Sequence, residues 1–497
     1  MSCFLLVAIF SAVLGMFQFG FNSSSLNSPQ KKVEQFLNES FKERYDRELS
    51  SDQISTFFSI SVSMFLVGGM IGALSGGWVA EKFGRKRGLI YTQVFSIFGA
   101  ALMGCCKYAS SYEMLVIGRV LVGISAGLFT GLSPLYIAEI APINIRGAMG
   151  TVNQLGVTTG IFTAMVLGLE NVLGGDDTWP LLLALTAAPA ILQCWILPFM
   201  PETPRYLILS KNEIEEAEEA LKKLRNTDNV RSEVEEIQNE EQDNDNETNY
   251  SIWQLLTSSE LRMCLLICIC LHLSQQLSGM VAIFYYSTSF FESAGIDPDS
   301  AQYATIGVGA ILVTMTLVTI PLMDRLGRRT LHLTGLAGIV ICSIMITVAL
   351  NYNTNEAVGI FLIVATLSFV VFFALGPGSI PWMAAGELFT QGPRAAAISV
   401  CVFVNWLGNL VVSLVFPQLQ ISLSEFSFLP FSIITAILFV ILFFYFPETK
   451  NRTANELSGL FQVPNAWKTA IGFKKANTEK PLNSTSYVNY GSDENTS

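Results

Sequence analysis

The chain has 497 residues, of which 51% are hydrophobic and only 14% are charged. Soluble globular proteins carry about 25% charged residues, so the composition excludes that class and indicates an integral membrane protein. The formal net charge is −11, but much of the acid lies in one polar segment, Glu213 to Glu247. The charge therefore does not point to a nucleic-acid partner, and the lipid bilayer is the expected surrounding.

The apolar residues form runs long enough to cross a bilayer. About twenty apolar residues span the hydrocarbon core as a helix. The sequence predicts an all-α membrane protein with twelve transmembrane helices in two pseudo-symmetric six-helix bundles. The predicted spans are residues 3–21, 53–79, 88–106, 112–137, 148–169, 179–199, 261–291, 301–323, 330–350, 357–386, 395–416 and 425–446.

The first span and its loop bear on topology. The span begins at Cys3 without a preceding basic stretch, which favours a retained helix over a cleaved signal peptide. Asn38-Glu39-Ser40 in the following loop is an acceptor pattern for N-glycosylation, so Asn38 is expected to be glycosylated outside the cell. Basic residues in short loops stay cytoplasmic. The basic loops around residues 82–87 and 325–329 therefore place both termini in the cytoplasm, although the longer first loop is also basic.

Residues 201–260 separate the two bundles. Glu219 and Lys223 form one of two i,i+4 pairs that predict a short helix near 212–225. The acidic stretch from Glu233 to Glu247 is poor in apolar residues and is predicted to be a flexible linker. The predicted organisation is a bundle over 1–200, a cytoplasmic loop over 201–260, a second bundle over 261–446 and a largely disordered cytoplasmic tail over 447–497.

Three short motifs occur in both halves at nearly the same offset. The pairs are Glu81–Lys86 with Asp324–Arg329, Glu139 and Arg146 with Glu387 and Arg394, and Pro201–Thr203 with Pro447–Thr449. Such matches indicate a duplicated six-helix unit, which is how many secondary transporters are built, with the substrate at the interface of the repeats.

The repeated motifs bring opposite charges to the cytoplasmic side. These residues are Arg85, Glu139, Arg146, Glu202, Arg328, Glu387, Arg394 and Glu448. One interpretation is anchoring with surface ion pairs that contribute about 0–1 kcal/mol each. The matched seven-residue Glu–Arg spacing favours a gate, in which these charges join the two halves when the inner mouth is shut.

Gln275 and Gln276 lie inside the apolar run 261–291. An unmet polar group in an apolar medium costs roughly 2–7 kcal/mol, so these side chains are expected to face the bundle interior or a cavity. One glutamine would suggest contact between helices, but the doublet with nearby Tyr285 and Tyr286 favours a binding surface.

The tenth span is predicted to be broken. Pro377 and Pro381 each remove a backbone donor, and a break at membrane depth is tolerated where it lines a cavity. Trp382 follows the break, and other spans carry Gln154 and Asn405. Together with Gln275 and Gln276 these groups fit a neutral polyol, because carboxamides donate and accept hydrogen bonds and an indole covers the apolar face of a sugar ring.

Charge is missing from the centre of the predicted spans. The middle third of each contains no Asp, Glu, Lys or Arg, which disfavours an ionic substrate. A proton symporter needs an intramembrane carboxylate, so facilitated transport is favoured. Four or five hydrogen bonds of about 0.5–1.5 kcal/mol each are enough for a millimolar affinity.

The motifs jointly resemble the sugar porters of the major facilitator superfamily, most closely the animal facilitative hexose transporters. They include Gly84–Arg87, Pro201–Arg205, Gln275–Gly279, Gly327–Arg329, Gly376–Gly378 with Pro381-Trp382, and Pro447–Lys450. The resemblance implies uniport of a hexose across the plasma membrane by alternating access. The Gln276-Leu277-Ser278 triplet resembles that of glucose-selective members, which implies D-glucose as the hexose. It also implies sugar contacts at Gln154, Gln275, Gln276, Trp382 and Asn405. Asn22 stands where related proton symporters carry an aspartate.

The chain departs from the resemblance at three positions. Val281, Leu312 and Ala374 stand where glucose-transporting relatives usually have polar sugar contacts. Losing these hydrogen bonds at about 1 kcal/mol each predicts an affinity lower by one or two orders of magnitude and a narrower dependence on the sugar hydroxyls.

Other functions remain open at this point. A proton-coupled sugar symporter and a non-transporting sugar receptor on the same scaffold are the alternatives. An enzyme is not indicated, because no nucleophile constellation or phosphate loop occurs. No cofactor or metal is predicted: the cysteines lie in or beside apolar spans without paired spacing, and His272 and His332 are expected to be packed.

Neutralising one partner of the predicted gate tests it. Glu387→Gln or Arg394→Gln should favour the inward-open state and slow transport, because the closed inner mouth loses an ion pair. Uptake is measured at matched surface expression, and flux equal to that of wild type would contradict the gate.

Overall fold

The computed structural model describes residues 2–142, 146–244, 250–352, 356–450, 452 and 456–457, and the predicted disordered tail lies almost entirely outside these ranges. Every regular element within them is helical, which confirms the predicted all-α class. Nine long helices are single: α1 (Cys3–Ser24), α3 (Ser51–Phe83), α4 (Arg85–Cys105), α5 (Tyr112–Ile140), α6 (Arg146–Leu167), α15 (Pro298–Leu326), α16 (Arg328–Asn351), α19 (Gln391–Leu423) and α20 (Leu429–Tyr445).

The remaining apolar spans each consist of two helices in line. They are α7 (Trp179–Ala184) with α8 (Ala187–Ile196), α13 (Arg262–Gln276) with α14 (Met280–Ser293), and α17 (Glu356–Leu375) with α18 (Ile380–Leu388). The shorter helices are α2 (Gln30–Tyr45), α9 (Pro204–Tyr206), α10 (Ile214–Arg225), α11 (Arg231–Asn244) and α12 (Ile252–Thr257).

The helices coincide with the predicted spans. Within the described residues, ten helical segments are long and apolar enough to cross a membrane by length and composition. Two shorter apolar helices, Thr151–Leu167 and Leu429–Tyr445, account for the other two predicted spans.

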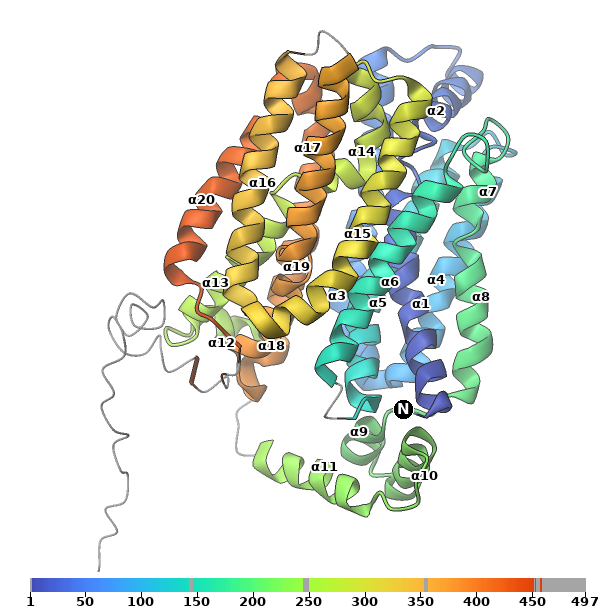
Figure 1. Ribbon diagram of the computed structural model, residues 1–497. Coiled ribbons are helices and arrows are strands. Elements are labelled where there is room, and N and C mark those ends of the chain that lie inside the picture. Colours follow the sequence, from blue (N-terminus) through green and yellow to red (C-terminus); the bar gives the residue numbers. More distant parts are fainter. Residues whose placement is uncertain are drawn as a thin grey trace, which may run out of the picture.

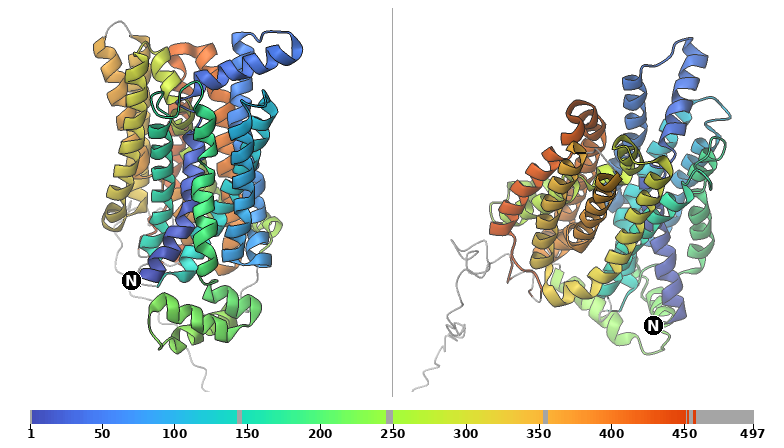
Figure 2. Two further views of the ribbon diagram at one scale, coloured as in Figure 1. Left: turned by 90° about the vertical axis from the view of Figure 1, so that its right-hand side faces the viewer. Right: turned by 45° about the horizontal axis from the view of Figure 1, so that its top comes forward.

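The long helices run side by side along one direction, and short helices lie at the two ends of the bundle (Figure 1). Helix α2 lies at one end, while α9, α10 and α11 lie at the end that carries the N-terminus, as the second view also shows (Figure 2). We call these the outer end and the inner end. Helices α1–α8 are called the N-terminal half and helices α13–α20 the C-terminal half.

The predicted acidic linker is in part a helix. Residues 231–244 form α11, where the sequence predicted flexibility from Glu233 onward. Val230 and Val234 are buried in a small apolar cluster with Leu221 of α10, and Arg225 pairs with Glu233 at 2.6 Å. Two apolar contacts and one ion pair therefore fix a helix that the average composition of the segment does not suggest. Residues 245–249 of the predicted linker lie outside the described ranges.

Glycines allow helices of the N-terminal half to approach closely. A Cβ atom at Gly68 of α3 would collide with the carbonyl oxygen of Val120 in α5, and one at Gly123 would collide with that of Phe65. Small residues at such crossings are typical of membrane helices, where van der Waals contact drives association.

The repeated motifs build the same cap at the inner end of both halves. Helices α4 and α16 begin after Gly84 (φ 84°) and Gly327 (φ 86°), which occupy the left-handed region. The Glu202 carboxylate accepts from the backbone N–H of Arg85 at 3.1 Å, and the Glu448 carboxylate accepts from that of Arg328 at 2.8 Å. Each carboxylate thus satisfies the free donors at a helix N-terminus.

The two halves contact each other at the outer end. Asn27, after α1, donates from Nδ2 to the Phe284 carbonyl at 2.9 Å and to Ser287 Oγ at 2.8 Å in α14. The Asn27 Oδ1 accepts from the backbone N–H of Thr288 at 3.2 Å, and Lys31 pairs with Glu292 at 2.7 Å. These contacts hold the outer end closed.

Substitution of a crossing glycine should destabilise the fold. Gly68→Val places a branched side chain against the α5 backbone, and overpacking of this kind costs about 1–3 kcal/mol. We expect a lower thermal unfolding temperature for purified protein in detergent. Gly77→Val is the matched control on the same helix, because a Cβ there meets no atom within 4 Å. Equal unfolding temperatures for the two variants would contradict the close crossing.

Candidate functional site

A cavity lies between the halves. The hollow, its open mouth included, contains about 660 Å³ of space not filled by atoms. Its lining residues are uncharged and come from both halves: Phe19, Ser23, Gln154, Val157, Ile161, Gln275, Gln276, Met280, Val281, Phe284, Tyr285, Leu312, Phe373, Gly378, Trp382, Asn405, Trp406 and Asn409.

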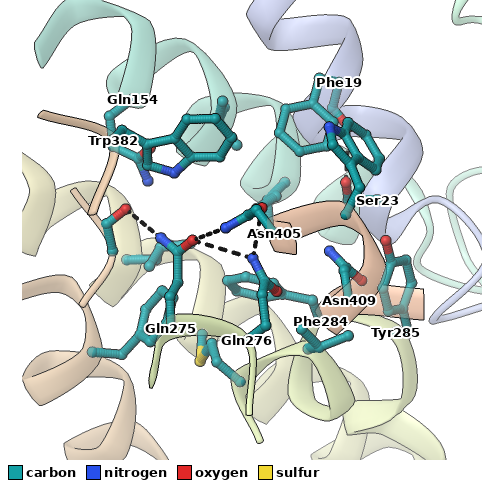
Figure 3. Close-up of a pocket in the computed structure, with 18 residues that line it drawn as sticks. Phe19, Ser23, Gln154, Gln275, Gln276, Phe284, Tyr285, Trp382, Asn405 and Asn409 are labelled. Atoms are coloured by element: carbon teal, nitrogen blue, oxygen red, sulfur yellow. Dashed lines mark hydrogen bonds between the residues drawn. The ribbon is translucent and has the colours of Figure 1, made fainter. Parts of the chain in front are cut away.

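All five side chains that the sequence singled out line this cavity (Figure 3). They are Gln154 of α6, Gln275 and Gln276 of α13, Trp382 of α18 and Asn405 of α19. Of the three apolar departures, Val281 and Leu312 are lining residues, whereas Ala374 is absent from the lining. Ala374 is buried, and its carbonyl oxygen accepts from Thr319 Oγ1 at 3.2 Å.

The break between α17 and α18 fixes the side chain of Gln275. In a helix the carbonyl of residue 377 accepts from the N–H of residue 381, but Pro381 has no N–H. Gln275 takes this place: its Nε2 donates to the Pro377 and Gly378 carbonyl oxygens, each at 2.8 Å. Gln275 is 5% exposed, so these carbonyl groups would otherwise be buried without partners.

Gln275, Gln276 and Asn405 form a carboxamide cluster. Asn405 Nδ2 donates to Gln275 Oε1 at 2.6 Å. Gln276 Nε2 donates to Asn405 Oδ1 at 2.9 Å and to Gln275 Oε1 at 3.1 Å. Since carbonyl oxygens only accept, Gln275 must turn its nitrogen to the α17–α18 break and its oxygen to the two neighbouring amides (Figure 3).

The cluster differs in polarity from the sequence-based expectation that each amide would both donate and accept. Both hydrogens of Gln275 Nε2 and both of Gln276 Nε2 are bound within the protein. Gln275 Oε1 already accepts twice. Toward the cavity the cluster therefore offers Gln276 Oε1 and the second lone pair of Asn405 Oδ1, both of which accept.

Other lining groups were not selected from the sequence. Trp406 Nε1 and Asn409 Oδ1 have no hydrogen-bond partner among the described residues, and both side chains line the cavity. Asn409 lies one helical turn after Asn405 on α19, so the i,i+4 spacing was the signal that could have identified it. Trp406 packs on Phe19 of the other half, with ring centroids 5.3 Å apart.

Arg119 is a buried charge that the sequence analysis overlooked, because it falls just outside the middle third of its span. The side chain is 0% exposed and donates from Nη1 to the Asn22 carbonyl oxygen at 2.9 Å, and its guanidinium lies 4.7 Å from the centroid of the Phe65 ring. Asn22 Oδ1 accepts from Thr186 Oγ1 at 3.1 Å. No Asp or Glu is among the buried residues in the part of the chain that the structure describes.

The predicted gate residues form two clusters, one in each half. Arg85 donates to Glu139 at 2.8 Å beside the Glu202 cap, and Arg328 donates to Glu387 at 3.2 Å beside the Glu448 cap. Burial raises the pKa of the Glu202 carboxyl, and its backbone hydrogen bonds act in the opposite direction. Each of these two ion pairs lies within one half.

The remaining predicted residues lie elsewhere at the two ends. Arg394 donates to the carbonyl oxygen of Phe389 at 3.1 Å, while the side chain of Arg146 lies outside the described part. Asn38 lies in α2 at the outer end, and its Oδ1 accepts from the backbone N–H of Leu49 at 3.0 Å. Among the described residues no group of three or more His, Cys, Asp or Glu could hold a metal ion.

Removal of the Gln275 carboxamide should lower the stability of the sugar-free protein. Gln275→Leu leaves the Pro377 and Gly378 carbonyl oxygens unpaired, at about 1–3 kcal/mol for each buried group. We expect a clearly lower thermal unfolding temperature. Gln154→Leu is the control from the same cavity, because the Gln154 side chain makes no hydrogen bond within the described ranges. The same unfolding temperature for both variants would contradict the role of Gln275 at the break.

Comparison with known proteins agrees with this architecture. Residues 7–461 match the model of the family described as "Sugar (and other) transporter". The chain is 43% identical over 467 residues to the facilitated glucose transporter member 1 of solute carrier family 2 from Gallus gallus, covering 94% of this chain and 95% of that protein. It is 44% identical over 462 residues to member 4 from Homo sapiens, covering 92% of this chain and 90% of that protein.

Solved structures show the same fold. The partially occluded inward-open structure of the xylose transporter XylE from E. coli superposes with a TM-score of 0.75 at 26% identity, covering 91% of this chain and 100% of that one. The proton:xylose symporter XylE bound to 6-bromo-6-deoxy-D-glucose gives 0.74 at 26% identity, covering 92% and 99%. The chain is a multi-pass membrane protein that belongs to the sugar transporter family of the major facilitator superfamily.

Proposed function

We propose that this sugar transporter is a facilitative uniporter of hexoses, with D-glucose as its main substrate. The observation that carries the proposal is the cavity, whose lining combines carboxamides and aromatic rings without a charged side chain. Such a lining matches a neutral polyol, since hydroxyl groups exchange hydrogen bonds with amides and an indole covers the C–H face of the ring. The relatives named as facilitated glucose transporters, at 43% and 44% identity, support the same substrate.

The surroundings of Arg119 favour uniport over proton symport. A coupling carboxylate must be protonated and released within the transport cycle. Asn22, whose backbone carbonyl oxygen accepts from Arg119, carries a neutral amide side chain, and the described buried residues include no carboxylate that could take this part. Proton symport is the second candidate, because the similar fold of XylE belongs to a proton:xylose symporter.

The two ends suggest how the halves alternate. The Asn27 and Lys31 contacts join the halves at the outer end, while the Arg85–Glu139 and Arg328–Glu387 ion pairs at the inner end each lie within one half. In the proposed cycle the outer contacts separate, the halves rock, and the inner clusters meet across the interface. Sugar then exchanges between the two sides of the plasma membrane, with both termini in the cytoplasm and Asn38 on the outside.

Val281 and Leu312 bear on substrate range. Both are buried apolar side chains in the cavity lining, at 4% and 1% exposure. They cannot bind a hydroxyl group, so hexoses should be held mainly through the carboxamide cluster and Trp382. We infer an affinity lower than a fully polar lining would give.

Uptake into liposomes tests the function. Purified protein should equilibrate D-glucose but not L-glucose, with saturation, and an imposed proton gradient should change neither rate nor final level. Stereospecific accumulation driven by the gradient would instead support the symporter. Asn22→Asp is a useful companion variant, because it places a carboxylate on the residue whose backbone carbonyl oxygen binds Arg119. A pH-dependent rate in that variant alone would support the role given to Asn22.

A further inference from the structure

His272 contacts the carboxamide cluster from outside the cavity. It lies on α13 one turn before Gln275 and Gln276, is 1% exposed and is not part of the cavity lining. Its Nδ1 lies 3.0 Å from Asn405 Nδ2. The ring stands edge-on to Trp382, with ring centroids 5.4 Å apart at 87°.

The hydrogen bonds of the carboxamide cluster determine the protonation of this ring. Gln275 must present its oxygen to Asn405, because its nitrogen is held by two carbonyl groups. Asn405 must then present Nδ2 to Gln275, and the same nitrogen faces His272 Nδ1. Since an amide nitrogen only donates, His272 Nδ1 is the unprotonated nitrogen and accepts this bond.

Both hydrogens of Asn405 are thereby committed. One binds Gln275 Oε1 and the other binds His272 Nδ1, so the amide cannot turn over without placing its oxygen against two acceptors. Asn405 Oδ1 is consequently held toward Gln276, which in turn leaves Gln276 Oε1 facing the cavity. The orientation of the whole cluster follows from the α17–α18 break at one side and His272 at the other.

We propose that His272 is a positioning residue that sets the hydrogen-bonding polarity of the carboxamide cluster, so that the sugar binds there only through hydroxyl groups that donate. This inference rests on the proposed function and adds the chemistry of recognition to it. A hydroxyl is recognised at the cluster for its hydrogen and not for its lone pairs. Groups that only accept, such as a fluorine or an ether oxygen, are excluded from these positions.

Two substitutions of His272 separate positioning from packing. His272→Leu removes the acceptor and leaves one Asn405 hydrogen unpaired, and we expect the KM for D-glucose to rise about tenfold with kcat changed much less. In His272→Gln the amide oxygen can accept from Asn405, so KM should return to within about threefold of wild type. A purely structural histidine would not be rescued in KM by glutamine.

His332 provides the matched control. It is the other buried histidine, at 0% exposure, but its Nε2 lies 3.1 Å from Ser274 Oγ, so it does not contact the cluster. His332→Leu should leave the KM for D-glucose within about twofold of wild type. An equal rise in KM for His332→Leu and His272→Leu would overturn the specific role of His272.

A ligand series on the wild-type protein tests the hydrogen-bonding polarity of the carboxamide cluster, and it does so even where His272→Leu does not fold. Binding of monodeoxy and monodeoxyfluoro D-glucoses is followed through the fluorescence of Trp382 and Trp406. At hydroxyls that donate to the cluster, the fluoro analogue should bind as weakly as the deoxy analogue, because fluorine has no hydrogen to give. Fluoro analogues that match D-glucose at every ring position would overturn the inference.

The outcomes distinguish the two proposals. If wild-type protein binds and equilibrates D-glucose while His272→Leu leaves KM unchanged, the inference fails and the proposed function stands. If the wild-type protein binds no hexose, the proposed function fails and the inference fails with it.

Discussion

The missing N–H of Pro381 is the feature on which the rest of the site depends. It frees the Pro377 carbonyl group inside the bundle, where water is excluded and an unpaired oxygen is costly. Gln275 satisfies this oxygen at 2.8 Å and is fixed by it. Asn405 and Gln276 then take the only orientations that pair donors with acceptors. The break between α17 and α18 thus orders a polar surface formed by side chains of α13 and α19.

The two ends of the molecule use different physical contacts. At the outer end, closure depends largely on neutral hydrogen bonds, such as those from Asn27 to Phe284 and Ser287, with the ion pair of Lys31 and Glu292 beside them. At the inner end, carboxylates cap helix N-termini and pair with arginines within each half. Because these caps and ion pairs each form within one half, they can stay intact when the halves separate there.

Much of the fold could be predicted from the sequence, because apolar run length and the position of prolines are local properties. All twelve spans and the break near Pro377 follow from them. The five lining side chains were predictable as well, since a carboxamide or an indole in an apolar span needs a polar partner. The polarity of the cluster was not predictable: it depends on which atom of each amide meets which neighbour across three helices, and this is fixed only by tertiary contacts.

Other differences have similar causes. Arg119 was missed because a count within one span cannot show that a residue near its edge is buried by α1 and α3. Helix α11 was missed because an average over an acidic segment conceals Val234, which packs with Leu221 of α10. Ala374 was expected at a sugar-contacting position from the family resemblance, but its neighbour Phe373 lines the cavity instead.

The inner-end cap also carries information about ancestry. The glycine with positive φ and the carboxylate that caps the next helix occur in both halves with matching geometry, from Gly84 with Glu202 and from Gly327 with Glu448. The cluster of Gln275, Gln276 and Asn405 lies in the C-terminal half, whereas the buried carboxamides Gln18, Gln93 and Gln193 of the N-terminal half form a different arrangement. A feature shared by both copies was present before the duplication, whereas a feature of one copy reflects later divergence. By this order the caps at the inner end are older than the sugar specificity of the cavity.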